Sequence, residues 1–242
     1  MGQYDEYLER TNWKYSAGLI TWVHKRILKT FIRVAKLTPG EVKLLEIGSG
    51  RGTGGLIANQ MAFAKYIGVE PTQALAKFSR ESYGHDVVED SLPDLVSIES
   101  GSMDATFSVH VLEHAPSHID AWAWVKEMKR IVRPGGNILI CTPDAQDYGT
   151  YFWDSDWSHG YPTTPRRLAQ ILQDHGLEIV FAGKMHFGSL SPIVATFSHF
   201  VALLLPTRLG DKLTLRIFGR PLISGLKIAI LWGLTYVVAK KP

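Results

Sequence analysis

The sequence has little cysteine and no sign of a secretory leader. Cys141 is the one cysteine among 242 residues. A lone cysteine excludes an intramolecular disulfide framework and a cysteine-rich zinc module, and it is typical of a reducing compartment. The first residues, MGQYDEYLERTNW, are polar and acidic, whereas a signal peptide is basic and then apolar. We therefore expect a cytoplasmic protein.

Charged residues are also few. They make up 20% of the chain against 45% hydrophobic residues, which is ordinary globular composition and excludes a disordered or collagen-like chain. Over residues 184–242, eight basic residues face one acid, Asp211, so this segment carries +7; because the net charge is +3, residues 1–183 carry −4. Basic charge among long apolar stretches leaves two interpretations open: a helical cap over the acceptor pocket, or peripheral contact with a membrane surface through residues 190–232. No zinc spacing and no paired aromatic residues of an RNA-binding strand occur, so we expect no nucleic-acid partner.

Hydrophobic periodicity predicts strands that alternate with helices. The expected strands are 42–47, 66–69, 87–88, 106–111, 137–142, 177–182 and 234–239, and the expected helices are 5–37, 56–65, 72–83, 117–132 and one that starts at 164. In the helix over 117–132, Ile119, Trp122 and Val125 are expected to be buried. Such alternation implies an α/β fold whose parallel sheet is covered on both faces, with right-handed crossovers.

The domain organisation follows from these elements. Residues 1–40 are expected to form an N-terminal helical cap, and 41–183 the core of the fold. The stretch 184–233 is too long for a connection, so it is expected to be a helical insertion, and 234–242 to be the closing strand of the core.

The most informative motif is the glycine-rich run GSGRGTGG at 48–55, directly after the first predicted strand. Glycines let the backbone turn sharply and let a ligand approach without a Cβ in the way. Glu70 closes the next strand, where an acid in doubly wound sheets accepts hydrogen bonds from ribose hydroxyls. The run also satisfies the dinucleotide pattern G-x-G-x-x-G, so a nicotinamide reductase stays open. Glu46 disfavours it, because a carboxylate before the first glycine would repel a pyrophosphate.

Taken in order, the motifs resemble the class I S-adenosylmethionine-dependent methyltransferases, in particular the small-molecule group called type 11. LLEIGSGRG resembles the first motif of that family, YIGVEP the second, and VVEDSLPD the segment that holds the adenine. MDATFSVHVLEHAPS resembles the fourth strand with its loop, IVRPGGNILICTP the turn into the fifth, and TYVVAKKP the antiparallel last strand. The resemblance implies a Rossmann-like, doubly wound, seven-stranded sheet whose last strand is antiparallel.

The resemblance also implies S-adenosyl-L-methionine as the cofactor. Glu46 would lie near the methionine amino group, Glu70 would hold both ribose hydroxyls, and Asp90 would hold the adenine amine. The residues expected around the cofactor are Glu46, Gly48, Ser49, Gly50, Gly52, Glu70, Pro71, Asp90, Ser91, Leu92 and His110.

Histidines are the candidates for acid–base chemistry, because their ordinary pKa lies near neutrality. We expect His159 and His114 on the acceptor side, as a base or as a ligand of the acceptor; the alternative is that they support their loops. Asp154, Asp156 and His159 have the spacing of a metal site. Three such residues in a short loop occur often by chance, so no metal site is expected.

Together these features predict methyl transfer from S-adenosyl-L-methionine to the oxygen, nitrogen or carbon of a small molecule. Aromatic residues in 148–161 and the apolar insertion favour a hydrophobic or sugar-containing acceptor. Three alternatives stay open beside it. They are an NAD(P)-dependent reductase, a non-catalytic cofactor-binding or membrane-associated partner protein, and a protein or nucleic-acid methyltransferase. The last is disfavoured because no Asn-Pro-Pro-Tyr element follows the fourth strand.

Overall fold

The computed structural model describes residues 17–185, 212–213, 216 and 233–242. The first part of the expected N-terminal cap lies outside the described residues. So does most of the expected insertion over 184–233, including nearly all of the proposed membrane contact at 190–232. Within the described part of the chain, no helix has the length and apolar character needed to cross a membrane.

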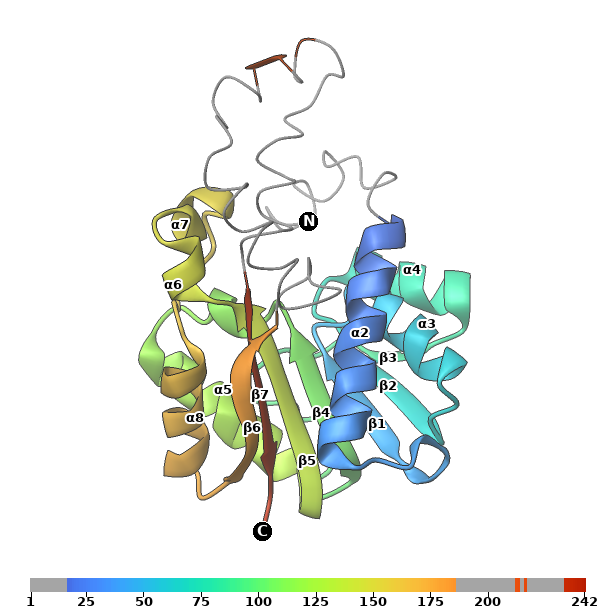
Figure 1. Cartoon of the computed structure of the whole chain (residues 1–242). Helices are drawn as coiled ribbons and strands as arrows, with labels where there is room; N and C mark the ends of the chain where they lie inside the picture. The colour runs from blue at the N-terminus through green and yellow to red at the C-terminus, as the bar shows by residue number, and fades with distance from the viewer. Residues whose placement is uncertain (1–16, 186–211, 214–215, 217–232) are drawn as a thin grey trace.

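One seven-stranded sheet forms the centre of the molecule, in the order β3-β2-β1-β4-β5-β7-β6 (Figure 1). The strands are β1 (Lys43–Ile47), β2 (Lys65–Val69), β3 (Asp86–Val88), β4 (Met103–Val109), β5 (Val132–Pro143), β6 (Glu178–Met185) and β7 (Leu234–Lys240). Strands β1 to β5 run parallel to one another, whereas β7 runs antiparallel to both β5 and β6. The expected doubly wound sheet with an antiparallel last strand is confirmed.

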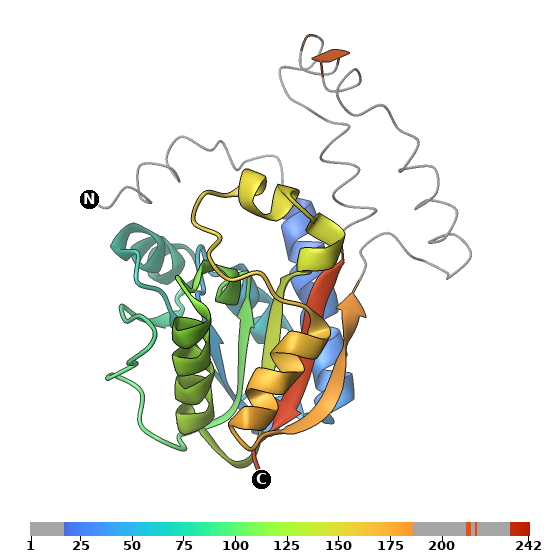
Figure 2. The ribbon, with the colours of Figure 1, turned by 90° about the vertical axis from the view of Figure 1, so that its left-hand side faces the viewer.

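Helices cover both faces of the sheet. They are α2 (Ala17–Ala35), α3 (Thr53–Gln60), α4 (Gln73–Tyr83), α5 (His118–Ile131), α6 (Ala145–Tyr148), α7 (Tyr151–Ser155) and α8 (Pro165–Asp174), with short 3₁₀ turns at Pro39–Glu41 and Leu112–His114. Figures 1 and 2 show α5 and α8 together on one face and α2 on the other.

Alternation along β1 divides its side chains between two cores. Leu44 packs with Ile27 of α2 and Ile57 of α3, while Leu45 packs with Val125 of α5 on the opposite side of the sheet. Successive strand residues point to opposite faces, so each strand contributes to both cores. Glu46 follows the same alternation and therefore points to the α3 side.

Helix ends follow the expected local signals. The Ser117 side chain accepts hydrogen bonds from the backbone N–H groups of Ile119 and Asp120, which caps α5. Thr164 caps α8 in the same way, and Pro165 occupies the first turn, where no N–H partner is needed. These caps explain why both helices begin where the sequence predicts.

The structure corrects several expected boundaries. Helix α3 begins at Thr53 rather than at residue 56, because Gly54 and Gly55 already belong to the helix. Strand β4 ends at Val109, since His110 has a φ of 57° that breaks the extended backbone. Two short helices, α6 and α7, follow β5, where no helix was expected.

The expected burial along α5 is wrong at two positions. Val125 is fully buried as expected, but Ile119 is 67% exposed and Trp122 is 42% exposed. The inward line of the helix runs through Ala121, Val125 and Met128 instead. Trp122 lies to the side of this line and packs on the His175 ring, with 4.3 Å between ring centroids.

Candidate functional site

The glycine-rich loop leaves β1 at the carboxyl edge of the sheet and is tied to the end of β2. The backbone N–H groups of Gly48 and Ser49 donate to the Val69 carbonyl, at 2.8 and 3.0 Å. Gly48 has a φ of 73°, and a Cβ there would lie 2.4 Å from a methyl carbon of Val111 in the loop after β4. Glycine is therefore required here both by conformation and by the close approach of a second loop.

Glu70 fixes the next part of this loop. Its side chain accepts a 2.8 Å hydrogen bond from the Gly50 N–H through Oε2, and a 2.9 Å bond from the Thr72 N–H through Oε1. A carboxylate can accept about four hydrogen bonds, so each oxygen keeps one free lone pair. Gly50 has a φ of 52°, and within the described residues a Cβ at this position would meet nothing within 4 Å. A rigid, nearly buried carboxylate thus borders open space beside the loop.

Glu46 lies beneath the first turn of α3. Its carboxyl is 2% exposed, and the Tyr66 hydroxyl donates to Oε2 at 2.5 Å. A Cβ on Gly54 would stand 2.2 Å from Oε1, so only glycine allows the helix to lie this close. Burial raises the pKa of the Glu46 carboxyl to about 8, the Tyr66 hydrogen bond opposes the increase, and the charge of Glu70 adds to it. A cation near this group would favour the ionised form.

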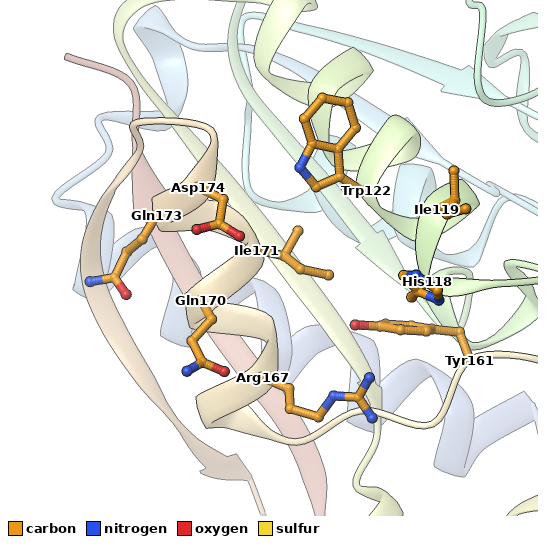
Figure 3. A pocket seen from close by; sticks show the side chains of 9 residues that line it. All are labelled: His118, Ile119, Trp122, Tyr161, Arg167, Gln170, Ile171, Gln173 and Asp174. Atoms are coloured by element: carbon orange, nitrogen blue, oxygen red, sulfur yellow. The ribbon is translucent and has the colours of Figure 1, made fainter.

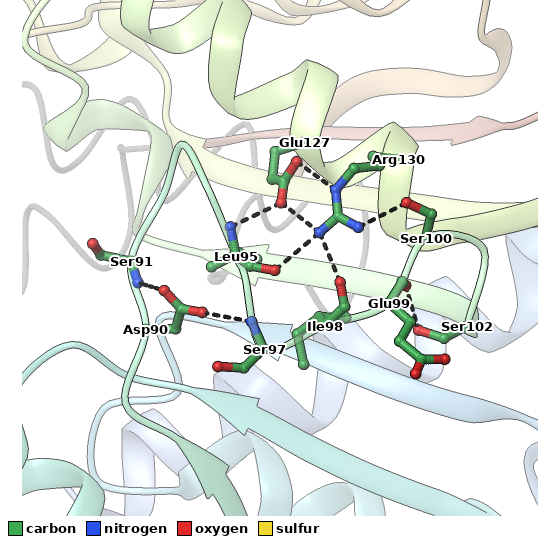
Figure 4. A network of polar contacts seen from close by, with 10 residues as sticks. All are labelled: Asp90, Ser91, Leu95, Ser97, Ile98, Glu99, Ser100, Ser102, Glu127 and Arg130. Carbon is green, nitrogen blue, oxygen red and sulfur yellow. Dashed lines mark hydrogen bonds and ion pairs between the residues drawn. The ribbon is translucent and has the colours of Figure 1, made fainter.

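Asp90 shapes the loop that follows β3. Its carboxylate accepts hydrogen bonds from the backbone N–H groups of Ser91, at 2.9 Å, and Ser97, at 3.1 Å (Figure 4). Ser91 is exposed, and Leu92 is half-buried against the core. Asp90 therefore holds both ends of a turn at the rim where the resemblance expects the adenine.

Arg130 of α5 anchors the same loop from behind. Its guanidinium donates to the carbonyls of Leu95 and Ile98, at 2.9 and 2.8 Å, and pairs with Glu127 at 2.6 Å (Figure 4). Glu127 in turn accepts the Leu95 N–H at 2.8 Å. The planar guanidinium suits several acceptors at once, which explains how residues 90–102 stay ordered without regular secondary structure.

A second group of polar side chains follows β4. The Glu113 carboxylate is fully buried, with His110 Nδ1 at 3.0 Å from one oxygen and the Thr142 hydroxyl donating to the other at 2.9 Å. Burial acts to raise the pKa of Glu113, but the hydrogen bond and charge from His110, with the nearby His114, leave it below its ordinary value. Glu113 is therefore a buried carboxylate that stays ionised at neutral pH.

His114 and His159 meet next to this carboxylate, with 5.1 Å between ring centroids. His114 Nδ1 lies 2.8 Å from the Ser158 hydroxyl, which itself donates to Asp156 at 2.7 Å. His159 Nδ1 lies 2.6 Å from the Phe152 carbonyl. Burial lowers the pKa of His114, so its ring is neutral near pH 7. Two histidines from separate loops thus face one another at the carboxyl edge.

Comparison with known proteins agrees with this geometry. The family model for the methyltransferase domain matches residues 45–140, which run from β1 into β5. This match to the methyltransferase domain covers less than half of the chain. The match contains the glycine loop, Glu70, the Asp90 loop and the Glu113–His114 turn, and it therefore agrees with the resemblance seen in the motifs.

Relatives of the methyltransferase domain are known in sequence and in structure. The ubiquinone biosynthesis O-methyltransferase of Xanthomonas oryzae is 30% identical over 115 residues, which are 45% of this chain and 46% of that protein. A 37.1 kDa protein of transposon TN4556 from Streptomyces fradiae is 30% identical over 157 residues, 58% of this chain and 44% of that protein. The chain spans about half the length of these curated relatives. The structure of a SAM-dependent methyltransferase from Archaeoglobus fulgidus has a TM-score of 0.66 and 20% identity, over 98% of this chain and 99% of that one, which shows the shared fold.

The methyltransferase domain brings most of the expected residues to one edge of the sheet. Gly48, Ser49, Gly50, Glu70 and His110 belong to the loops that follow β1, β2 and β4. Pro71 is exposed next to Glu70, and Gly52 caps α3 with a φ of 83°. Whether these residues contact a cofactor stays a prediction.

Several polar partners near the carboxyl edge of the sheet were not expected from sequence. They are Tyr66 beside Glu46, Thr142 beside Glu113, and the pair Ser158 and Asp156 behind His114. The only signal for Glu113 was its place next to His114 after a strand. Partners such as Ser158, 44 residues from His114, depend on how two loops meet.

A separate hollow of about 640 Å³ lies between α5 and α8 (Figure 3). Trp122, Ile171 and Arg167 line it, and Arg167 stacks on the Tyr161 ring at 5.4 Å from the centroid. None of the candidate cofactor residues or histidines of the carboxyl edge lines this hollow. We therefore place the candidate site at the glycine loop.

Proposed function

We propose that this protein transfers a methyl group from S-adenosyl-L-methionine to a small-molecule acceptor. The observation that carries the proposal is the Glu70 carboxylate, held by two backbone N–H groups beside the open side of the glycine loop. A fixed carboxylate with free lone pairs suits the two hydroxyls of a ribose. The methyltransferase domain match and the relatives named above support the same activity.

The residues present fit this cofactor. No atom of the described residues lies within 4 Å of the place where a Cβ of Gly50 would stand, which leaves a ligand access to the loop backbone. The Glu70 carboxylate borders the loop and attracts a sulfonium or ammonium group, and a cation bound nearby would also favour the ionised form of the buried Glu46 carboxyl. Ser49 adds a buried hydroxyl without a partner in the described residues. The chemistry of this donor set matches a cationic nucleoside.

Each side chain of the candidate set has a proposed task. Glu70 holds the ribose, Asp90 with Ser91 and Leu92 borders the adenine, and Glu46 lies toward the methionine amino group. The remaining positions, Gly48, Ser49, Gly50, Gly52, Pro71 and His110, shape the walls of the same pocket. Since the loops that carry them are tied together by hydrogen bonds, they orient the cofactor before the acceptor arrives.

When bound, S-adenosyl-L-methionine supplies an electrophilic methyl group on a sulfonium sulfur. The chain must align the acceptor with it and remove a proton from the acceptor. We propose that His114 and His159 act on the acceptor group that receives the methyl. A hydroxyl acceptor agrees with the O-methyltransferase named above, whose relation to this chain is 30% identity over 115 residues.

Titration calorimetry with S-adenosylhomocysteine tests the proposal. Wild-type protein is expected to bind one equivalent. Glu70→Gln should lose the ribose hydrogen bonds, which costs about 1–3 kcal/mol, or about 5- to 150-fold in Kd. The matched control is Glu81→Gln on α4, whose exposed carboxylate pairs only with Lys77 across 3.8 Å in the described residues, and which should bind like wild type.

The nicotinamide alternative is tested in the same experiment. NADH should give no heat of binding, because its pyrophosphate would lie over the buried Glu46 carboxyl, whose ionised form is favoured by a cation and not by a phosphate. Tight binding of NADH without binding of S-adenosylhomocysteine would contradict the proposal.

A further inference from the structure

Glu113, His114 and His159 form a cluster that the expected cofactor pocket does not use. One ligand atom from each of these three residues lies within 4.8 Å of the others. Glu113 and His114 belong to the turn after β4, whereas His159 comes from the segment after α7. Two separate loops therefore present two imidazoles and one carboxylate to the same point.

The hydrogen bonds of the two histidines determine which ring nitrogen is free. The Phe152 carbonyl can only accept, so His159 donates from Nδ1 and keeps a lone pair on Nε2. The Ser158 hydroxyl gives its proton to Asp156, so it must accept from His114 Nδ1. The lone pair of His114 is then also on Nε2. Metal-binding histidines are held in this way, with the second ring nitrogen donating to a carbonyl or, here through a serine, to a carboxylate.

The charge of Glu113 also favours a cation at this point. The carboxylate is completely buried, and the side chains that form hydrogen bonds with it are the His110 ring and the Thr142 hydroxyl. Neither carries a fixed positive charge. A buried carboxylate is stabilised best when a cation stands next to it, and its oxygens keep free lone pairs for that purpose.

We propose that Glu113, His114 and His159 bind a divalent first-row transition-metal ion. Two imidazoles and one carboxylate are a ligand set for Zn²⁺ or Fe²⁺ with open positions, whereas Mg²⁺ prefers oxygen ligands alone. A tetrahedral ion with ligands at about 2.0–2.1 Å would place the ligand atoms about 3.3 Å apart. The three groups therefore close in when the ion binds.

The proposed ion indicates which class of acceptor the protein methylates. This part of the inference rests on the proposed function. An open coordination position takes an oxygen of the acceptor, and a hydroxyl bound to a divalent cation loses its proton to solvent more readily. His114 and His159 then act on the acceptor through the ion, not as bases. Acceptors with a hydroxyl are the class that fits.

Zinc binding measured by calorimetry on chelator-treated protein tests the site. Wild type should bind one equivalent of Zn²⁺, and Co²⁺ in its place should give the visible absorbance of a nitrogen- and oxygen-ligated ion. Removing a ligand in His159→Gln should weaken Zn²⁺ at least 10-fold and change the Co²⁺ spectrum. His118→Gln, which removes an exposed histidine at the start of α5, should change neither.

A second pair of variants tests the site without removing a ligand. Asp156→Asn weakens the acceptor behind Ser158 and His114, and the expected loss in Zn²⁺ affinity is about 10- to 100-fold. Asp154→Asn makes the same change on an exposed carboxylate two residues away and should have no effect. Equal affinities for Asp156→Asn, Asp154→Asn and wild type would overturn the proposed site.

Binding of S-adenosylhomocysteine by the same proteins separates the two proposals. Wild type that binds S-adenosylhomocysteine but no Zn²⁺ overturns the metal site and leaves the methyltransferase proposal standing. Wild type that binds Zn²⁺ but no S-adenosylhomocysteine overturns the methyltransferase proposal alone. The His159→Gln variant is expected to bind S-adenosylhomocysteine like wild type, which also shows that it folds.

Discussion

The buried carboxyl of Glu46 links the stability of the fold to pH. Its pKa rises from 4.5 to about 8 on burial, so the folded chain holds a proton that the unfolded chain releases between these values. Stability from this group is therefore fully present below about pH 4.5 and is lost as the pH rises toward 8, by up to about 1.4 kcal/mol per pH unit.

Glu46→Gln should remove this dependence, because an amide does not titrate. We expect the free energy of unfolding of wild type to fall relative to that of Glu46→Gln between pH 5 and 8, in urea titrations at each pH. Glu81→Gln, on the exposed face of α4, serves as the control and should run parallel to wild type. Parallel curves for wild type and Glu46→Gln would show that the carboxyl ionises normally.

For Glu46, the sequence predicts the position in the fold but not the hydrogen-bond partner. The places of Glu46 and Glu70 at the ends of two strands follow from the strand pattern alone. The contact of Glu46 with Tyr66 does not, because it depends on the register of β1 and β2, in which Glu46 stands opposite Gly68 and Leu44 opposite Tyr66. No local pattern contains that register.

At the scale of elements, the conformation of the loop over residues 90–102 is stabilised by one side chain of helix α5. Arg130 of α5 donates to two carbonyls of this loop and to the Ser100 hydroxyl. Arg130→Lys keeps the charge but cannot make all of these bonds at once. We expect faster hydrogen exchange at the Leu95 and Ser97 amides and a loss of about 1–3 kcal/mol in stability.

A matched change elsewhere provides the control for Arg130. Arg167→Lys on α8 removes a guanidinium whose hydrogen bond is to the Pro162 carbonyl, at 3.2 Å, and exchange in the 90–102 loop should stay as in wild type. If hydrogen exchange in the loop were the same in both variants, Arg130 would not be the residue that holds the loop. The hydrogen bonds that the Asp90 carboxylate accepts from Ser91 and Ser97 would then be the main restraint.

Helices and strands with strong end signals were predictable, and short elements were not. Ser117 and Thr164 mark the starts of α5 and α8, and both are confirmed. Helices α6 and α7 are too short for a hydrophobic period to show, and such helices form only by packing on the rest of the fold. Ile119 and Trp122 were predicted to be buried because spacing defines a helix face only within about one residue.

At the scale of the whole molecule, topology decides which loops meet. Asp154, Asp156 and His159 have the spacing of a metal site within one loop, but no metal site was expected from them, because such spacing occurs often by chance. The sheet instead brings the segment after β5 to the turn after β4, so that His159 stands beside Glu113 and His114, while Asp156 lies one hydroxyl behind. The parallel order of β4 and β5 makes this meeting necessary, because the carboxyl ends of parallel neighbours lie at one edge.

Binding at that edge should stabilise the whole chain, since the pocket exists only when the loops after several strands are assembled. A ligand at 100 times its Kd adds about 2.7 kcal/mol if it binds the folded state alone. For a chain of 242 residues this corresponds to a rise of about 5–11 °C in Tm. S-adenosylhomocysteine should produce this shift in a thermal melt, and NADH at the same concentration should not.

Glu70→Gln in the same concentration of S-adenosylhomocysteine should show a smaller rise in Tm, because the stabilisation depends on the logarithm of the ratio of ligand concentration to Kd. An equal shift for Glu70→Gln and wild type would mean that the ligand is held away from the Glu70 carboxylate, and would move the site from the glycine loop.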